Sequence, residues 1–165
     1  MSRWIAPAIA IAAIVWVVLL AAAPVLPVPL AGLLYAAGSL ICHQIPERSF
    51  HYQGFQLPVC ARCLGLYAGG AAGGLSAVAG VLVARADHRI TTRHIVTALA
   101  AVPTVTTFVL EHGAGWRVSN ATRALAGIPL GAAVAFVVVS ALATLHYDEC
   151  APRRPIGHGQ PPANI

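Results

Sequence analysis

Charged residues are scarce in this sequence. Only 9% of its 165 residues are charged, whereas 58% are hydrophobic, and the mean hydropathy is +0.77. A soluble domain normally carries about 25% charged residues and needs polar side chains to cover its surface. This shortage excludes an ordinary water-soluble domain, and it predicts that the lipid bilayer is the main solvent of the chain.

Lysine is absent and cysteine is rare. All ten basic residues are arginines, and the net charge of +5 is spread over short segments between apolar runs. Charge spread in this way forms no basic patch, so we expect no nucleic-acid binding. Four cysteines are too few for a disulfide scaffold. Cys42, Cys60 and Cys63 lie close together in the sequence and indicate a site, whereas Cys150 stands apart.

Long apolar runs, in contrast, follow one another along the chain. They cover residues 4–23, 28–42, 59–84, 95–110 and 124–147, and runs near twenty residues are typical of membrane-spanning helices. We predict an all-α, polytopic transmembrane bundle of about five spans. It forms a single membrane domain over residues 1–147, and residues 148–165 are expected to be a disordered tail.

The first run has two interpretations. Arg3, the apolar stretch and the small residues Ala21 to Ala23 also resemble a cleavable signal peptide. The stretch from Trp4 to Ala23 is longer than the roughly 7 to 15 residues of a usual signal-peptide core. We therefore favour a retained first helix.

Glycines repeat every four residues in two of the predicted spans. Gly65, Gly69 and Gly73 do so in the third span, and Gly127 and Gly131 do so in the fifth. Residues four apart share a helix face, so this spacing predicts close helix packing, with a substrate groove as the minor alternative.

Counting crossings predicts where the polar residues meet. If each span crosses once, the end of span two, the start of span three, the end of span four and the start of span five share one membrane face. The polar loop 43–58 and the loop 111–123 then lie at that face. The three clustered cysteines, several arginines and histidines, and Glu111 are brought together there.

The cysteines have the pattern of a metal or redox site. Cys60 and Cys63 are three residues apart at the start of a predicted helix, where the helix dipole favours thiolates. Cys42 ends the preceding span, and it can meet the other two cysteines because the two helix ends are neighbours across one loop. Three thiolates and one further ligand would complete a zinc-type tetrahedral set. His43 is the favoured fourth ligand, provided that the helix ends at this point, because helical neighbours point about 100° apart. His51, His112 and Glu111 are alternatives.

The arginines predict an anion site beside the thiols. Arg117, Asn120 and Arg123 are spaced by three and are expected to form a polar stripe on the first turns of the fifth helix. Arginine near hydrocarbon is costly unless it is paired or used, and its guanidinium group suits carboxylate or phosphate. Ion pairing with Glu111 is the structural alternative. The predicted set is Arg48, Arg62, Glu111, Arg117, Asn120 and Arg123.

Two blocks of the sequence carry a resemblance. The first reads Cys42-His43-Gln44 and then Cys60-Ala61-Arg62-Cys63, and the second contains Glu111, Arg117, Ser119-Asn120 and Arg123. The chain resembles, over roughly residues 30 to 135, an uncharacterised family of prokaryotic integral-membrane proteins, a domain of unknown function. Glu111 stands where the family pattern has Asp. The resemblance implies a site at these residues and implies no particular reaction.

Three classes of function follow from these residues. The first is a membrane metal-binding protein, with zinc as the cofactor, whose arginines hold an anionic lipid headgroup or a small anionic substrate. An open ligand position would make it a metal-dependent enzyme. The second is a thiol-disulfide oxidoreductase that uses Cys60 and Cys63, with Cys42 resolving. The third, a small transporter or assembly factor, ranks last because the middles of the spans are almost wholly apolar.

The arginine count leaves the orientation of the protein in the membrane nearly undecided, because the two faces carry equal numbers. Arg3, Arg48, Arg62, Arg117 and Arg123 fall on the predicted site face, and Arg85, Arg89, Arg93, Arg153 and Arg154 fall on the other. If the motif arginines are discounted as functional, the positive-inside rule places the site outside the cytoplasm. We expect a multi-pass protein of the cell membrane, and its oligomeric state is left open.

Overall fold

The computed structural model describes residues 4–83 and 90–150, and it is predominantly helical. The helices are α1 (Ile5–Ala22), α2 (Val28–Ile41), α3 (Ala61–Val83), α4 (Ile90–Gly113) and α5 (Asn120–Cys150). Short 3-10 turns, η2 (Ala23–Val25) and η3 (Pro46–Arg48), and two strands, β1 (Ser49–Tyr52) and β2 (Phe55–Cys60), complete the described elements. The prediction of an all-α membrane bundle is confirmed.

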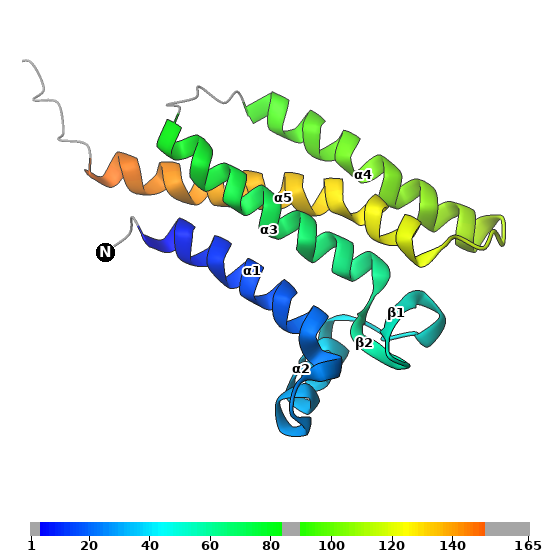
Figure 1. Cartoon of the computed structure of the whole chain (residues 1–165). Coiled ribbons are helices and arrows are strands. Elements are labelled where there is room, and N and C mark those ends of the chain that lie inside the picture. The colour runs from blue at the N-terminus through cyan, green and yellow to red at the C-terminus, as the bar shows by residue number, and fades with distance from the viewer. Residues whose placement is uncertain (1–3, 84–89, 151–165) are drawn as a thin grey trace, which may run out of the picture.

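Four of the helices run side by side and form the bundle (Figure 1). The segments Ile5–Val25, Ala61–Gly80, His94–Gly113 and Asn120–Leu142 are long and apolar enough to cross a membrane. Large apolar side chains point outward from them, as with Ile11 at 60% and Leu99 at 65% exposure. An apolar exterior is the expected surface of helices whose surroundings are lipid.

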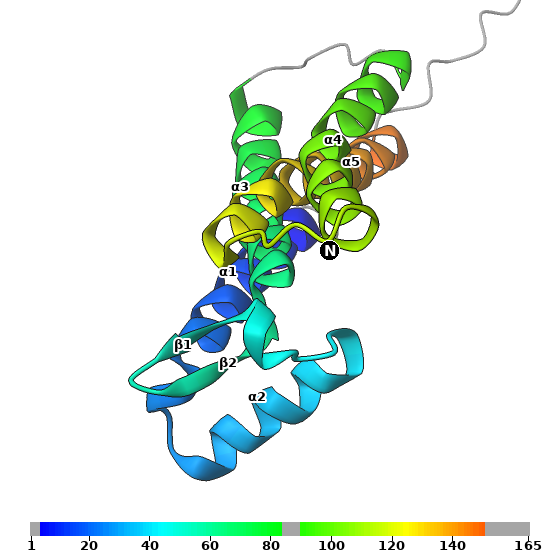
Figure 2. The same ribbon diagram turned by 90° about the vertical axis from the view of Figure 1, so that its right-hand side faces the viewer.

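The second predicted span differs from the other four. Residues 28–42 do form a helix, but α2 has 14 residues, so it is about 21 Å long, whereas the hydrocarbon layer is about 30 Å thick. Pro24 and Pro27 end α1 and turn the chain sharply. Figure 2 shows that α2 then lies across the end of the bundle instead of running along it.

The loop that was expected over residues 43–58 contains a β-hairpin. β1 and β2 pair antiparallel, with Tyr52 opposite Phe55 and Ser49 opposite Cys60. The two turn residues, Gln53 and Gly54, both have positive φ, which is the backbone of a two-residue type I′ turn. The sequence did not reveal this hairpin, because its two strands are short and one contains a proline.

Glycines bring α3 and α5 into close contact. A Cβ at Gly65, Gly69 or Gly73 would overlap the carbonyl oxygen of Ala124, Ile128 or Ala132 on α5. From the other side, a Cβ at Gly127 or Gly131 would overlap the backbone of α3. This is the tight packing that the four-residue spacing predicts, and it makes α3 and α5 the centre of the bundle.

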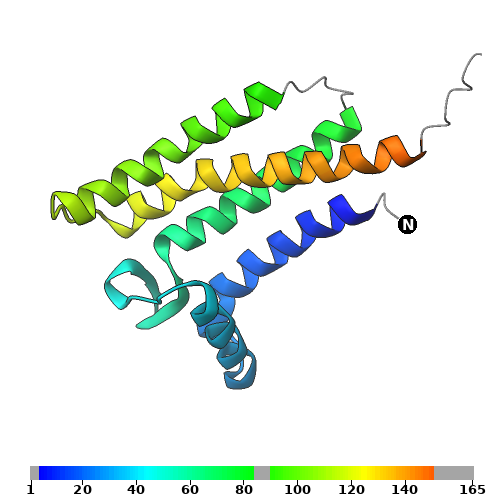
Figure 3. The same cartoon turned by 180° about the vertical axis from the view of Figure 1, so that it is seen from behind.

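The bundle has two unlike ends. At one end lie α2, the hairpin, the start of α3 and the connection between α4 and α5 (Figures 1 and 3). At the other end lie the first residues of α1 and the last described residues of α5. α5 continues through Cys150, three residues into the predicted tail, and the rest of that tail lies outside the described residues.

Candidate metal centre and arginine network

Three cysteines from different elements meet where the hairpin joins the bundle. Cys42 is the C-cap of α2, Cys60 is the last residue of β2, and Cys63 lies in the first turn of α3. Their Sγ atoms all lie within 4.8 Å of one another. The grouping predicted from the sequence is therefore present, and all three thiols are free.

The spacing of the thiols suits a tetrahedral ion. Zinc-sulfur bonds of about 2.3 Å in a tetrahedron place two sulfurs about 3.8 Å apart. The Cys60 and Cys63 Sγ atoms are 3.3 Å apart, and the third thiol lies within the same small volume. A modest adjustment of side-chain torsions would accommodate the ion.

Apolar residues surround the thiols, and hydrogen bonds link the thiols to one another. Cys42 is only 8% exposed and packs with Leu20 and Val59. The backbone N–H of Cys60 donates to Cys42 Sγ over 3.2 Å, and hydrogen bonds to a ligand atom of this kind orient it toward a metal ion. The hydrogen bond with the Cys63 thiol is the main cause that lowers the pKa of Cys60 to about 5.

His43, the favoured fourth ligand, is exposed and is not part of this group. α2 does end at Ile41, as the prediction required, but the chain continues with Cys42 extended at φ −144° and ψ 139°. Successive side chains of an extended chain point to opposite sides, so His43 turns away as Cys42 turns in. His51 and His112 are also exposed and lie outside the group, as does Glu111.

Gln44 holds α2 against the hairpin, a role that the sequence did not suggest. Its Nε2 donates to the carbonyl oxygens of Tyr35 and Pro58, each over 2.8 Å. Its own carbonyl accepts from Gln56 Nε2 over 2.6 Å, and the Tyr35 hydroxyl donates to the Gln56 carbonyl. The backbone of Gln44 has a positive φ of 49°. This clamp fixes the position of Cys42 relative to Cys60.

On the other side of α3, Glu111 joins two arginines. Arg62 Nη2 lies 3.1 Å from Glu111 Oε2, and Arg123 Nε lies 2.5 Å from Glu111 Oε1. The Glu111 side chain is 3% exposed. Arg62 also lies over the Phe108 ring, with its guanidinium carbon 5.7 Å from the centroid. The network links α3, α4 and α5. Arg62 and Arg123 therefore form ion pairs with Glu111, which the sequence offered as the structural alternative to an anion site.

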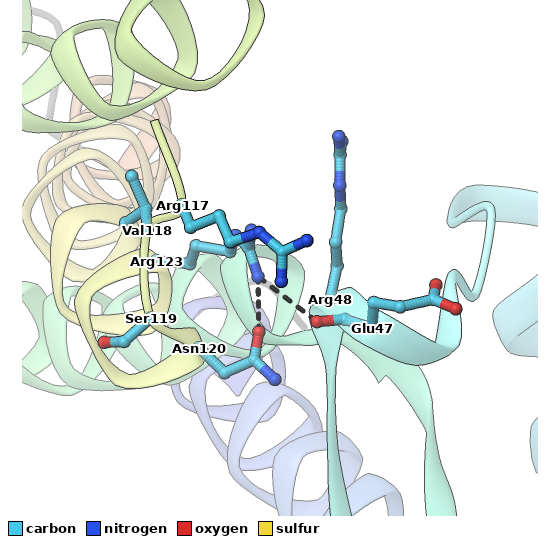
Figure 4. Close-up of a pocket in the computed structure, with 7 residues that line it drawn as sticks. All are labelled: Glu47, Arg48, Arg117, Val118, Ser119, Asn120 and Arg123. Atoms are coloured by element: carbon cyan, nitrogen blue, oxygen red, sulfur yellow. Dashed lines mark hydrogen bonds between the residues drawn. The ribbon is translucent and has the colours of Figure 1, made fainter. Parts of the chain in front are cut away.

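The other predicted anion-site residues line a cavity next to this network. The cavity has a volume of about 470 Å³ and is lined by Glu47, Arg48, Arg117, Val118, Ser119, Asn120 and Arg123 (Figure 4). Arg117 precedes α5 instead of lying on its first turn, so the expected stripe of three is reduced to Asn120 and Arg123. Arg62 and Glu111 lie behind the lining and hold Arg123 in place.

Ser119 and Asn120 position the start of α5. Ser119 Oγ accepts the backbone N–H of Thr122 over 3.1 Å, which is an N-cap. Asn120 Nδ2 donates to the Ser49 carbonyl over 2.9 Å, and its Oδ1 accepts from Arg123 Nη1 over 2.6 Å. Asn120 thus ties α5 to the hairpin. A serine three residues before a threonine at a helix start was the available sequence signal for the cap.

The fold and this site define a helical integral-membrane protein with a cluster of thiols and arginines at one end of its bundle. The chain belongs to the family described as predicted membrane protein (DUF2085), which matches residues 42–137. The matched region contains all three clustered cysteines, Glu111 and the arginines of the network. The family resemblance noted in the sequence is confirmed.

Two archaeal relatives are similar over short segments. An uncharacterised protein of Methanocaldococcus jannaschii is 61% identical over 36 residues, which cover 22% of this chain and 23% of that protein. An uncharacterised protein of Methanothermobacter thermautotrophicus is 55% identical over 29 residues, 18% of this chain and 26% of its own length. The match thus spans about a quarter of each relative. No solved structure matches the chain.

Proposed function

We propose that this protein binds a zinc-type metal ion through the thiolates of Cys42, Cys60 and Cys63 at one face of the membrane. The observation that carries the proposal is the convergence of three free thiols, from α2, β2 and α3, within 4.8 Å. Soft thiolate ligands select zinc and similar ions over magnesium or calcium.

The ligand count favours an open site over a closed one. Structural zinc sites normally have four protein ligands, whereas catalytic sites have three and keep a position for water or substrate. Among the residues that the structure describes, the group contains three ligand atoms and no histidine or carboxylate. A water or a substrate atom would complete the tetrahedron, and a metal-bound water is a nucleophile for hydrolysis.

A thiol-disulfide function is the second candidate. The 3.3 Å separation of the Cys60 and Cys63 Sγ atoms and the lowered pKa of Cys60 are also features of a redox pair. Cys42 counts against this candidate. It is buried among apolar side chains, where a partner protein reaches it poorly. Its sulfur accepts a backbone hydrogen bond from Cys60, which holds it in place as a metal ligand requires.

Metal analysis of three purified proteins separates these candidates. We expect about one equivalent of zinc per chain in the wild type and loss of that zinc in Cys60→Ser. Cys150→Ser is the matched control, because Cys150 ends α5 at the far end of the bundle, and it should retain the metal. Metal-free wild type with a reducible bond between Cys60 and Cys63 would support the redox candidate instead. Size-exclusion chromatography checks that each variant is folded.

A further inference from the structure

The cavity at the same end of the bundle as the thiol cluster has the size and position of a ligand site. Its volume of about 470 Å³ is within the range of about 300 to 1,000 Å³ that is usual for small-molecule sites. Its walls come from η3 and from the chain that leads into α5, segments far apart in the sequence. It lies at the end of the bundle where headgroups of the bilayer are expected.

The lining is strongly cationic. Three arginines face one glutamate, which gives a net charge of +2. The Glu47 side chain is turned away from the guanidinium groups of Arg117 and Arg123, and Arg123 instead bonds to the Glu47 backbone carbonyl (Figure 4). The nearest carboxylate behind the wall, Glu111, is already shared by two arginines. The excess positive charge therefore remains available to a ligand.

The three arginines differ in how firmly they are held. Arg123 is fixed by Glu111 and Asn120, and a fixed donor costs little entropy when a ligand binds. Arg48 makes one long contact, with its Nη1 3.5 Å from His112 Nε2. Arg117 is exposed, and within the described part of the chain its side chain has no hydrogen bond or ion pair. The side chains of Arg48 and Arg117 can therefore reorient to contact a ligand.

The first turn of α5 adds further donors. Ser119 and Asn120 both line the cavity, and the N–H groups in a first turn lack helical acceptors. Ser119 already serves the N–H of Thr122, which leaves the preceding N–H groups for another acceptor. The positive end of the helix dipole favours an anion at the same place.

We propose that this cavity binds a phosphate group. A carboxylate presents two acceptor oxygens in one plane, whereas a phosphate presents three or four acceptor oxygens in a tetrahedron. Three guanidinium groups from separate segments, together with a helix N-terminus, match the tetrahedral group better. The phosphate belongs either to a lipid headgroup or to a soluble ester. This inference is independent of the metal proposal.

Titration of the full-length protein in a maltoside detergent, which carries no phosphate, tests the site. One arm uses inorganic phosphate and the other uses short-chain phosphatidylglycerol, each followed by calorimetry. Arg117→Gln and Arg48→Gln remove two lining arginines, of which only Arg48 makes a contact within the described part of the chain, the long one with His112. Arg93→Gln is the matched control, because Arg93 lies in the first turn of α4, at the other end of the bundle.

Saturable binding is expected in at least one arm, and the arm that responds identifies the source of the phosphate. Loss of one charge-assisted contact should weaken binding about tenfold in Arg117→Gln and in Arg48→Gln, while Arg93→Gln binds as the wild type does. Absence of saturable binding in both arms would overturn the proposal, as would equal weakening by all three substitutions. Zinc content measured on the same samples keeps this outcome separate from that of the metal site.

Discussion

Glu111 is the residue on which the polar network between α3, α4 and α5 depends. Its two carboxylate oxygens each face a different arginine, and its side chain is 3% exposed. Two guanidinium groups so close together repel each other unless an anion lies between them. The carboxylate thus holds Arg62 and Arg123 in position, and Arg123 in turn forms one wall of the cavity.

Glu111→Gln should destabilise the protein. The substitution keeps the size of the side chain but leaves two largely buried arginines without their counter-charge, and breaking a buried pair in this way costs about 3 to 5 kcal/mol. Thermal unfolding in detergent measures the effect. Glu47→Gln is the control, because Glu47 is exposed and contributes its backbone carbonyl. Equal melting temperatures for Glu111→Gln and the wild type would contradict this role.

At the same scale, the sequence predicted some contacts and missed others for clear reasons. The grouping of Cys42 with Cys60 and Cys63 follows from the short connection between their elements, so it does not depend on the number of spans. The orientation of His43 depends on one pair of backbone angles, which residue spacing cannot supply. Whether an arginine pairs with Glu111 or faces a cavity depends on side-chain torsions, and the sequence left that choice open.

Among the elements, α3 and α5 form the closest pair, and their glycines are the reason. The glycine spacing alone predicted that these faces pack, because no other residue type allows two helix backbones to approach so closely. The sequence could not show that α5 is the partner of α3. That choice depends on the overall arrangement of the bundle.

Gly69→Ala should therefore weaken the bundle. A methyl group at this position overlaps the carbonyl oxygen of Ile128, so the two helices must separate, at a cost of about 1 to 3 kcal/mol. Gly80→Ala is the matched control on the same helix, because a Cβ there meets nothing within 4 Å and alanine favours the helix. Unfolding experiments in detergent should show a loss of stability for Gly69→Ala alone. A similar stability for both variants would count against this packing.

From the short length of α2 we infer that the chain crosses the membrane four times instead of five. Its apolar side chains, including Val28 at 84% and Leu40 at 87% exposure, are outward-facing, and it carries no charged residue. A helix of this kind that lies across the bundle end suits the boundary between headgroups and acyl chains. Hydropathy alone could not separate it from a short span, because both are apolar.

For the whole molecule, four crossings place the start of α1 and the end of α5 at the same membrane face. The thiols and the cavity lie at the opposite face, with α2 and the hairpin. We predict that tags attached at the first and last residues are accessible from one side of sealed vesicles, and that a tag inserted between Gln53 and Gly54 is accessible from the other. Protease protection measures the accessibility of all three tags. First and last tags on opposite sides would indicate five crossings.

The number of crossings also affects how the protein is oriented in the membrane, and we infer that orientation from the arginines. Arg48, Arg62, Arg117 and Arg123 are at the site end, and Glu111 already pairs with two of them. Arg3, Arg85, Arg89, Arg93, Arg153 and Arg154 flank the other end by their places in the sequence, and all but Arg93 lie outside the described residues. With Arg3 at that end, the positive-inside rule favours a cytoplasmic location for it and an extracytoplasmic site.

X-ray absorption spectroscopy of the metal-loaded protein tests the central claim most directly, because it counts the atoms around the ion. Coordination by Cys42, Cys60 and Cys63 predicts three sulfur scatterers at about 2.3 Å and one lighter atom at about 2.0 Å. Cys63→Ser should reduce the sulfur count by one. A first shell made only of nitrogen and oxygen, or a sulfur count unchanged in that variant, would contradict a metal site built from these three thiols.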